Sequence, residues 1–181
     1  MSKIVIVYHS GYGHTAAVAK AVARGAAGVA DTTAQLVSVD DIAKHWADLD
    51  EADAIIFGSP TYMGGVSAPF KSFMDASAKV WFVQGWKDKL AAGFTHSGSQ
   101  NGDKFNTVTQ LFTFAKQHGM IWAFEVDTDD PTFARNFHQR ALEKELLLRP
   151  IGNTVYFMPP YVITDEEIAQ LTRGTRELLD S

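Results

Sequence analysis

The feature that most constrains the fold is the alternation of short, wholly apolar runs with segments of helical periodicity. Residues 4–8 read Ile-Val-Ile-Val-Tyr, without a polar position among them. A strand with one face in water would alternate in polarity, so this run is typical of a strand buried on both faces of a parallel sheet. The alanine-rich segment 16–27 follows, with Val18, Val22 and Ala26 at helical spacing. A strand followed by a helix is the opening of a βαβ unit.

The same alternation continues along the chain. Four more apolar runs predict strands at residues 34–39, 54–57, 90–95 and 120–126. The segments that follow the strands predict helices at residues 40–46, from 69 onward, at 105–117, at 132–148 and at 165–179. The length of 181 residues suits one domain. The sequence therefore predicts an α/β fold, a single domain over residues 1–181 with a doubly wound parallel sheet and helices on both faces.

Composition narrows the classes of function. The chain has 16 Lys and Arg against 21 Asp and Glu, a net charge of −5, so we expect no nucleic-acid partner. It has no cysteine, which excludes structural disulfides, iron–sulfur clusters and cysteine nucleophiles. No run reaches the about 18 to 20 apolar residues that span a bilayer, and the run at 4–8 is too short for a signal-peptide core. We therefore expect a cytoplasmic protein with no membrane span.

Three loops follow the first, third and fourth predicted strands, at residues 9–15, 58–65 and 96–102. In a doubly wound sheet ligands bind beyond the carboxyl ends of the strands, so these loops share one rim. The first loop lies at a helix start, where backbone N–H groups and the helix dipole favour an anion. Its two glycines let the chain approach a phosphate, and the hydroxyls of Ser10 and Thr15 can add hydrogen bonds. Residues 10–15 contain no Lys or Arg, which excludes a P-loop nucleotidase.

The first loop also fits a dinucleotide fingerprint, with Gly11, Gly13 and Ala16 in the glycine pattern and Asp40 in the ribose position. A dinucleotide on the first turn gives no reason for two further polar, glycine-bearing loops on the same rim, whereas a flat ring standing across the rim does. The loop at 60–65 offers backbone donors, an aromatic wall and two glycines where a ring can come close. The three loops together favour a flat cofactor that carries a phosphate, and a dinucleotide-binding reductase without flavin is an alternative.

Three motifs of the chain occur in an order and at a spacing known from one protein family. They are Ser-Gly-Tyr-Gly-His-Thr at 10–15, Gly-Ser-Pro-Thr at 58–61 with Phe-Met-Asp at 73–75 and Trp81, and residues 95–102 with His-Gly-Met at 118–120. Over residues 3 to 126 the chain resembles the WrbA-type NAD(P)H:quinone oxidoreductases of the flavodoxin superfamily. The resemblance implies a flavodoxin-like five-stranded sheet of order 2-1-3-4-5, FMN as cofactor, and NADH or NADPH as hydride donor.

The resemblance also implies roles for individual residues. The phosphate of FMN would lie on Ser10, Gly11, Tyr12, Gly13, His14 and Thr15. The isoalloxazine would lie on Pro60, Thr61, Tyr62, Met63, Gly64 and Gly65. Further flavin contacts would come from His96, Ser97, Gly98, Ser99, Gln100 and Asn101, and from Gln117, which stands where the family has a histidine. Tyr12 would lie near the nicotinamide, and Trp81, from the same or a neighbouring subunit, near the substrate.

Residues 127–161 match the family poorly, so we interpret them as an insertion before the last helix, either a lid or a subunit contact. No metal site is expected, because His9 and His14 lie five residues apart across a loop without an acidic neighbour.

We expect an FMN-dependent oxidoreductase that passes a hydride from NAD(P)H through the flavin to a quinone-like acceptor in a two-electron ping-pong reaction. Because FMN carries the chemistry, no catalytic side chain is assigned. Expected partners are the small acceptor and further copies of the chain, as a dimer or tetramer; the alternative is a flavodoxin-like electron carrier.

Overall fold

The computed structural model describes residues 1–99, 103–122, 128, 130–146, 148, 150 and 165–179. Two compact units make up the chain, Met1–Ala123 and Phe124–Ser181. A single domain over residues 1–181 with an insertion at 127–161 therefore stays a prediction. Within the described residues, the helices are all too short or too polar to cross a membrane.

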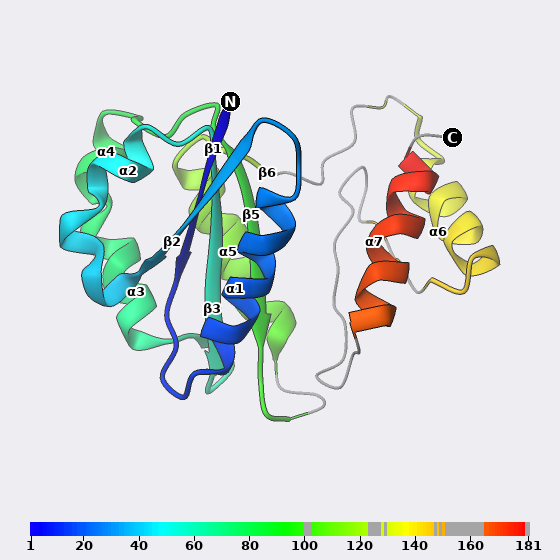
Figure 1. The fold of residues 1–181 in the computed structure, drawn as a ribbon, viewed down its shortest axis with the longest axis horizontal. Coiled ribbons are helices and arrows are strands. Elements are labelled where there is room, and N and C mark those ends of the chain that lie inside the picture. The colour runs from blue at the N-terminus through cyan, green and yellow to red at the C-terminus, as the bar shows by residue number, and fades with distance from the viewer. Residues whose placement is uncertain are drawn as a thin grey trace. The chain divides into compact units, whose positions relative to one another are not determined.

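The first unit is built on a parallel sheet (Figure 1). Its strands are β1 (Ser2–Tyr8), β2 (Thr32–Ser38), β3 (Ala54–Tyr62), β5 (Leu90–His96) and β6 (Ile121–Trp122). They lie in the order β2-β1-β3-β5-β6, with every neighbouring pair parallel. A two-residue strand, β4 (Gly65–Val66), pairs antiparallel with the end of β3. Without β4 this is the expected 2-1-3-4-5 order, so the predicted flavodoxin-like sheet is confirmed.

The first strand of the sheet is buried on both faces, as its unbroken apolar run indicated. Val5, Ile6 and Val7 are each fully buried. Side chains alternate along a strand, so Val5 and Val7 face the main core while Ile6 points to the other side of the sheet. Figure 1 shows α1 (His14–Ala27) on that other side, opposite α3 (Ala68–Ala76). Helices thus cover both faces of the sheet.

An aromatic cluster fills the main core between the sheet and its helices. Phe57 of β3 contacts Phe73 of α3, Trp86, and Phe114 of α5 (Lys104–Gln117), with ring centroids 5.2–6.5 Å apart. Trp86 lies after α4 (Ala78–Phe82) and donates its indole N–H to the Asp50 carboxylate at 3.0 Å. These contacts hold α3 and α5 against the sheet.

Two local expectations in the first unit were wrong. The single short helix expected at 40–46 is divided at His45 into a 3-10 helix, η1 (Val39–Lys44), and α2 (Trp46–Asp50). Ser38 caps η1 by accepting a hydrogen bond from the Asp40 N–H at 3.3 Å. The loop expected at 58–65 is instead β3 as far as Tyr62, since residues 58–60 pair in parallel register with β5.

The second unit contains α6 (Phe133–Glu143) and α7 (Asp165–Leu179) around a small core of Phe137, Ala141, Leu146, Leu148 and Leu178. The helix expected at 132–148 ends earlier because Glu145 takes a left-handed conformation with φ of 60°. The N–H of Leu146 then bonds the Ala141 carbonyl at 2.8 Å, which closes the helix. Residues 123–127 and 151–164 lie outside the described residues, so the end of the strand expected at 120–126 and the role expected of the insertion remain predictions.

Candidate functional site

The three polar loops meet at one rim of the first unit, as predicted. β1, β3 and β5 run parallel, and their carboxyl ends lie at the same edge of the sheet (Figure 1). Tyr12 of the first loop contacts Tyr62 at the end of β3, with ring centroids 6.2 Å apart. Thr15 Oγ1 lies 2.7 Å from His96 Nε2 at the end of β5. Side chains from all three loops therefore line one place.

The first loop is shaped as a helix N-terminus that is open to an anion. Gly13 precedes α1 in a left-handed conformation with φ of 87°, which glycine adopts at little cost. Ser10 Oγ accepts the N–H of Ala16 at 3.1 Å, and the first turn of α1 has no acidic side chain. A carboxylate there would repel an anion, so its absence leaves the positive end of the helix dipole to a ligand.

Side chains that can carry positive charge surround the same helix end. The ring of His14 lies 6.1 Å from that of His96, and the charges of His14 and Lys104 both act on His96. Burial, and then these two neighbours, lower the pKa of the His96 imidazole. Although the 10–15 loop has no Lys or Arg, the folded chain thus brings the His96 imidazole of β5 to Thr15, and the charge of Lys104 from α5 acts on that imidazole.

The second loop is a β-hairpin that turns at Met63 and Gly64. Both residues take left-handed conformations, with φ of 49° and 80°. Two side chains of α5 bind the backbone of the hairpin. Asn106 donates to the Gly64 carbonyl at 2.5 Å, and Gln110 accepts the N–H of Val66 at 3.1 Å. A Cβ on Gly65 would come within 3.1 Å of the Gln110 amide, so Gly65 serves this packing.

A row of hydroxyls ties the hairpin strand to the rest of the rim. Thr61 Oγ1 donates to Thr107 of α5 at 2.8 Å and lies 2.8 Å from Thr95 Oγ1. Ser67 is fully buried, and its Oγ lies 2.8 Å from His9 Nδ1. The sequence analysis did not predict three site residues of α5, namely Asn106, Thr107 and Gln110. The sequence shows them as polar positions on a helix, and only the folded chain shows that they contact the end of β3 and the hairpin.

Tyr12, Tyr62 and Met63 form an exposed wall beside the anion site. Tyr12 is 84% exposed and meets Tyr62 edge to face, and Met63 is fully exposed at the hairpin tip. The contact between Tyr12 and Tyr62 joins the first loop to the hairpin. An aromatic edge beside an anion-binding helix end fits a planar ring that carries a phosphate ester.

The third loop is described as far as Ser99 and again from Asp103. Ser97 donates to the Ser99 carbonyl at 3.0 Å, which Lys104 also bonds at 2.7 Å, and none of the described residues crowds Gly98. Gln100 and Asn101 lie outside the described residues, so their predicted flavin contacts remain predictions. Asp40, the residue of the dinucleotide alternative, bonds Ser38 at 3.1 Å and serves as part of a helix cap.

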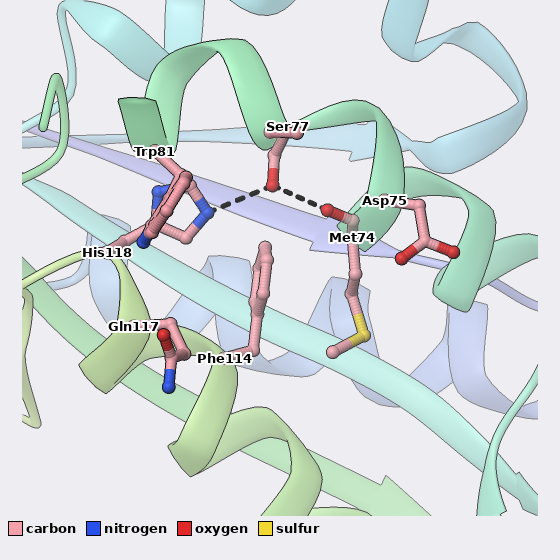
Figure 2. Close-up of a pocket in the computed structure, with 8 residues that line it drawn as sticks. Met74, Asp75, Ser77, Trp81, Phe114, Gln117 and His118 are labelled. Carbon is pink, nitrogen blue, oxygen red and sulfur yellow. Dashed lines mark hydrogen bonds between the residues drawn. The ribbon is translucent and has the colours of Figure 1, made fainter. Parts of the chain in front are cut away.

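Gln117 and Trp81 lie far from the rim within one chain. Gln117 is the last residue of α5, which starts at the rim and at about 1.5 Å per residue ends about 20 Å away. Figure 2 shows both residues beside a pocket of about 210 Å³, whose other lining residues are Met74, Asp75, Ser77, Ala78, Phe114 and His118. The structure thus brings these two predicted residues to each other and not to the three loops.

The pocket is built around the buried His118. Its Nε2 lies 2.9 Å from Ser77 Oγ, and Ser77 in turn donates to the Met74 carbonyl at 2.7 Å (Figure 2). Burial lowers the pKa of His118 to about 4, so the ring is neutral at pH 7. Across the described part of the chain, no group of three or more His, Asp or Glu side chains could hold a metal ion.

A doubly wound sheet of this order, with a helix N-terminus free of acidic side chains and exposed aromatic residues at its carboxyl rim, is typical of a flavodoxin-like protein. The family model for NADPH-dependent FMN reductases matches residues 10–126. The chain belongs to this family, and the resemblance to WrbA-type proteins is confirmed.

Individual relatives agree with this assignment. Flavodoxin FldP of Pseudomonas aeruginosa is 49% identical over 126 residues, 67% of this chain and 65% of that protein. An NAD(P)H dehydrogenase (quinone) of Trichlorobacter lovleyi is 34% identical, covering 67% of this chain and 70% of that protein. The crystal structure of a WrbA-like flavodoxin from Agrobacterium tumefaciens superimposes with a TM-score of 0.67 at 40% identity, over 98% of this chain and 96% of that one. The chain thus spans just under two thirds of the length of FldP.

Proposed function

We propose that this protein is an FMN-dependent oxidoreductase that passes a hydride from NADH or NADPH to a quinone-like acceptor in a two-electron ping-pong reaction. The observation that carries the proposal is the contact of all three loops at one rim, Tyr12 with Tyr62 and Thr15 with His96. That rim joins an anion site to an aromatic wall, as a phosphorylated flat cofactor requires. The family match and the quinone dehydrogenase among the relatives support the same reading.

The residues of the chain bind and orient the cofactor. The backbone N–H groups of the 10–15 loop and the Thr15 hydroxyl hold the phosphate, and the hairpin at Met63 and Gly64 supports the ring. Bound FMN supplies the capacity to accept a hydride from a nicotinamide and release two electrons to an acceptor. Tyr12, exposed at the edge of the ring site, stacks against donor and acceptor in turn. No side chain is required to move a proton in the transfer.

Gln117 and Trp81 reach a ring site only from a second copy of the chain. Trp81 is 45% exposed, and the neighbouring Phe82 and Val83 are 81% and 72% exposed. Three consecutive exposed apolar side chains favour a protein interface over a water-facing helix end. We therefore include a homo-oligomer, dimer or tetramer, in the proposal, with the enzyme acting in the cytoplasm.

An electron carrier is the second candidate, because the relative with 49% identity is named a flavodoxin. Such a carrier exchanges electrons with partner proteins and does not oxidise NAD(P)H itself. Carriers dock through charged surfaces, so their rates fall steeply as added salt shortens the Debye length from about 10 Å at 0.1 M to about 3 Å at 1 M. A neutral quinone offers no ion pair to screen.

The deciding experiment is stopped-flow absorbance on protein loaded with FMN. Mixing with NADH or NADPH should bleach the flavin, and mixing the reduced protein with benzoquinone should restore its colour at a rate that changes little between 0.1 and 1 M salt. Trp81→Ala should slow only the second step, and by about tenfold or less, as one aromatic stack is worth about 0.5 to 1.5 kcal/mol. Protein with full FMN occupancy that no nicotinamide reduces would establish the carrier instead.

A further inference from the structure

The side chain of His96 contacts the loop expected to hold the phosphate. His96 is the last residue of β5, and its Nε2 lies 2.7 Å from the hydroxyl of Thr15 in the first turn of α1. Thr15 is 1% exposed, so its side chain and the His96 ring are packed together at the start of α1. The resemblance had placed His96 among the residues expected to make further flavin contacts.

The hydrogen count at Thr15 restricts what His96 can do. A threonine hydroxyl has one proton to donate and lone pairs to accept with. If Thr15 donates to a phosphate oxygen, it can only accept from His96, whose Nε2 must then carry a hydrogen. Anion binding thus selects those forms of the imidazole that are protonated at Nε2, either one neutral tautomer or the cation.

We propose that His96 is a positioning residue of the phosphate site, which holds the Thr15 hydroxyl toward the phosphate and takes up a proton when a phosphate dianion binds. The inference rests on the proposed function, since it assumes the FMN phosphate at the start of α1. It adds a coupling between cofactor binding and pH.

The charges around His96 give the direction of that coupling. His14 of α1 and Lys104 of α5 face the imidazole, while Pro60 of β3, its neighbour in strand register, does not titrate. Burial and these two groups lower the pKa of His96 in the free protein. A dianion beside Thr15 would reverse the electrostatic balance and favour the cation. Binding should therefore take up a proton and weaken as the pH rises through the pKa of the complex.

The test compares FMN with riboflavin, which lacks the phosphate, on wild type and His96→Gln. The glutamine amide can donate to Thr15 but cannot gain a charge. Dissociation constants are measured by quenching of flavin fluorescence between pH 5.5 and 8.5. At pH 5.5 His96→Gln should bind FMN about 10- to 100-fold more weakly than wild type, the factor of one charge-assisted hydrogen bond. The ratio of the dissociation constant of His96→Gln to that of wild type should fall toward one at pH 8.5. For riboflavin this ratio should be near one at every pH.

His45→Gln is the matched control, because His45 is a half-buried histidine that bonds Asp48 near the start of β1, away from the loops. It should leave every dissociation constant unchanged. Calorimetric titration of FMN at pH 7 in two buffers of different ionisation enthalpy should show proton uptake in wild type and none in His96→Gln.

An FMN ratio that is the same at every pH, or an equal loss of riboflavin, would overturn the inference and leave a purely structural role for His96. That result would leave FMN binding intact, and the proposed function with it. Failure of wild type to bind FMN at any pH would overturn both.

Discussion

The imidazole of His118 donates through Nε2 to Ser77 Oγ at 2.9 Å. The direction follows from Ser77, whose single hydroxyl proton is used on the Met74 carbonyl at 2.7 Å. His118 Nδ1 is therefore the unprotonated atom, and it is buried with no hydrogen-bond partner among the described residues. The ring lies between Trp86 and Phe114, with centroids 4.5 and 4.9 Å away. Protonation would put a charge in that apolar space, which is why burial lowers the pKa of His118 to about 4.

The first prediction is a loss of stability in mild acid. Between an unfolded pKa near 6.5 and a folded pKa of about 4, the unfolded chain binds a proton that the folded chain does not. The free energy of unfolding should fall by roughly 3 kcal/mol as the pH drops through that window. Urea unfolding of wild type and His118→Gln at pH 7 and pH 4.5 measures it, and the variant should lose less. His14→Gln, at an exposed histidine, should keep the wild-type pH dependence; equal slopes in all three proteins would refute the role of His118.

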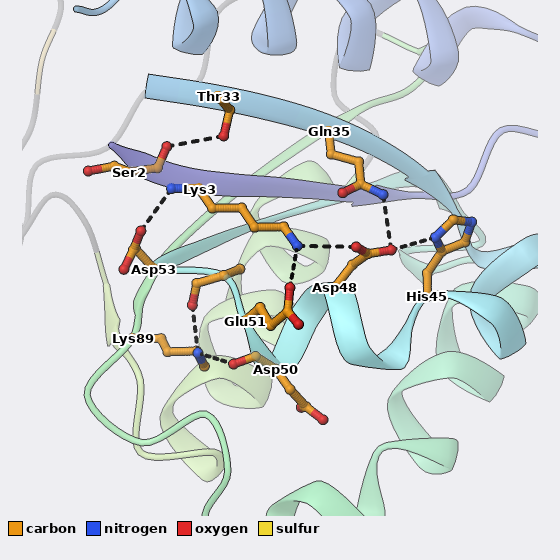
Figure 3. A network of polar contacts seen from close by, with 11 residues as sticks. Ser2, Lys3, Thr33, Gln35, His45, Asp48, Asp50, Glu51, Asp53 and Lys89 are labelled. Atoms are coloured by element: carbon orange, nitrogen blue, oxygen red, sulfur yellow. Dashed lines mark hydrogen bonds and ion pairs between the residues drawn. The ribbon is translucent and has the colours of Figure 1, made fainter. Parts of the chain in front are cut away.

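A second pH effect should appear in stronger acid, from the network around Asp48 (Figure 3). Asp48 bonds His45 at 2.8 Å, Lys3 at 3.1 Å and Gln35 at 3.1 Å. The bond with His45, followed by those with Lys3 and Gln35, lowers the pKa of Asp48 to about 2. The ionised Asp48 therefore stabilises the folded protein fully above pH 4, and this stabilisation is lost as the pH falls toward 2.

Asp48→Asn should therefore melt at a lower temperature than wild type at pH 5, and the difference should narrow by pH 2. Asp41→Asn is the control, because Asp41 bonds Lys44 at a longer distance of 3.4 Å and its side chain is more exposed than that of Asp48. Thermal melts followed by circular dichroism would settle the point, and a gap that stays constant from pH 5 to 2 would count against it.

The third prediction contrasts two tryptophans. Trp86 is fully buried and bonds Asp50 at 3.0 Å, whereas Trp81 is 45% exposed. Trp86→Phe should lower the free energy of unfolding by about 2 to 3 kcal/mol through lost packing and one lost hydrogen bond. Trp81→Phe should change it by less than about 0.5 kcal/mol. Denaturant titrations of the two variants side by side give the comparison, and similar losses would show that Trp81 also belongs to the core.

The fourth prediction concerns two glycines of the rim. Gly64 has φ of 80°, where an L side chain is strained, and a Cβ there would come within 3.3 Å of the Asp103 carboxylate, whereas no described residue lies within 4 Å of a Cβ on Gly98. Gly64→Ala should cost about 1 to 2 kcal/mol of unfolding free energy. Gly98→Ala should be neutral or slightly stabilising, because alanine reduces the entropy of the unfolded chain. The same denaturant assay applies, and an unchanged Gly64→Ala would mean that the hairpin relaxes around the substitution.

Much of the fold could be predicted from local pattern. The unbroken apolar run at 4–8 predicted a two-sided buried strand, and Val5, Ile6 and Val7 are indeed fully buried. The helix expected over residues 16–27 is α1, which ends at Ala27 directly before Gly28. Patterns of this kind suffice because burial on both faces and helix ends depend on residues close in sequence.

Other features depended on partners distant in sequence. Pro60 and Thr61 resemble a loop, yet they continue β3 because β5 and the hydroxyls of Thr95 and Thr107 pair with them. The helix expected through residue 148 ends at Glu143 because Glu145 adopts a left-handed conformation. Glutamate has no preference for that conformation, so the sequence did not predict it. In both places the energy of a non-local contact or a particular turn exceeds a weak local preference.

The parallel α/β architecture, the order of its elements and the three loops at one rim follow from the amino-acid sequence, because hydrophobic periodicity and the direction of parallel strands specify each of them. Which side chains meet at that rim depends on the folded chain. It joined Thr15 to His96 across 81 residues, brought Lys104 toward the anion site, and placed Gln117 with Trp81 at the far end of α5. Those meetings depend on helix length, strand register and the packing of an aromatic core, which no single segment of the chain contains.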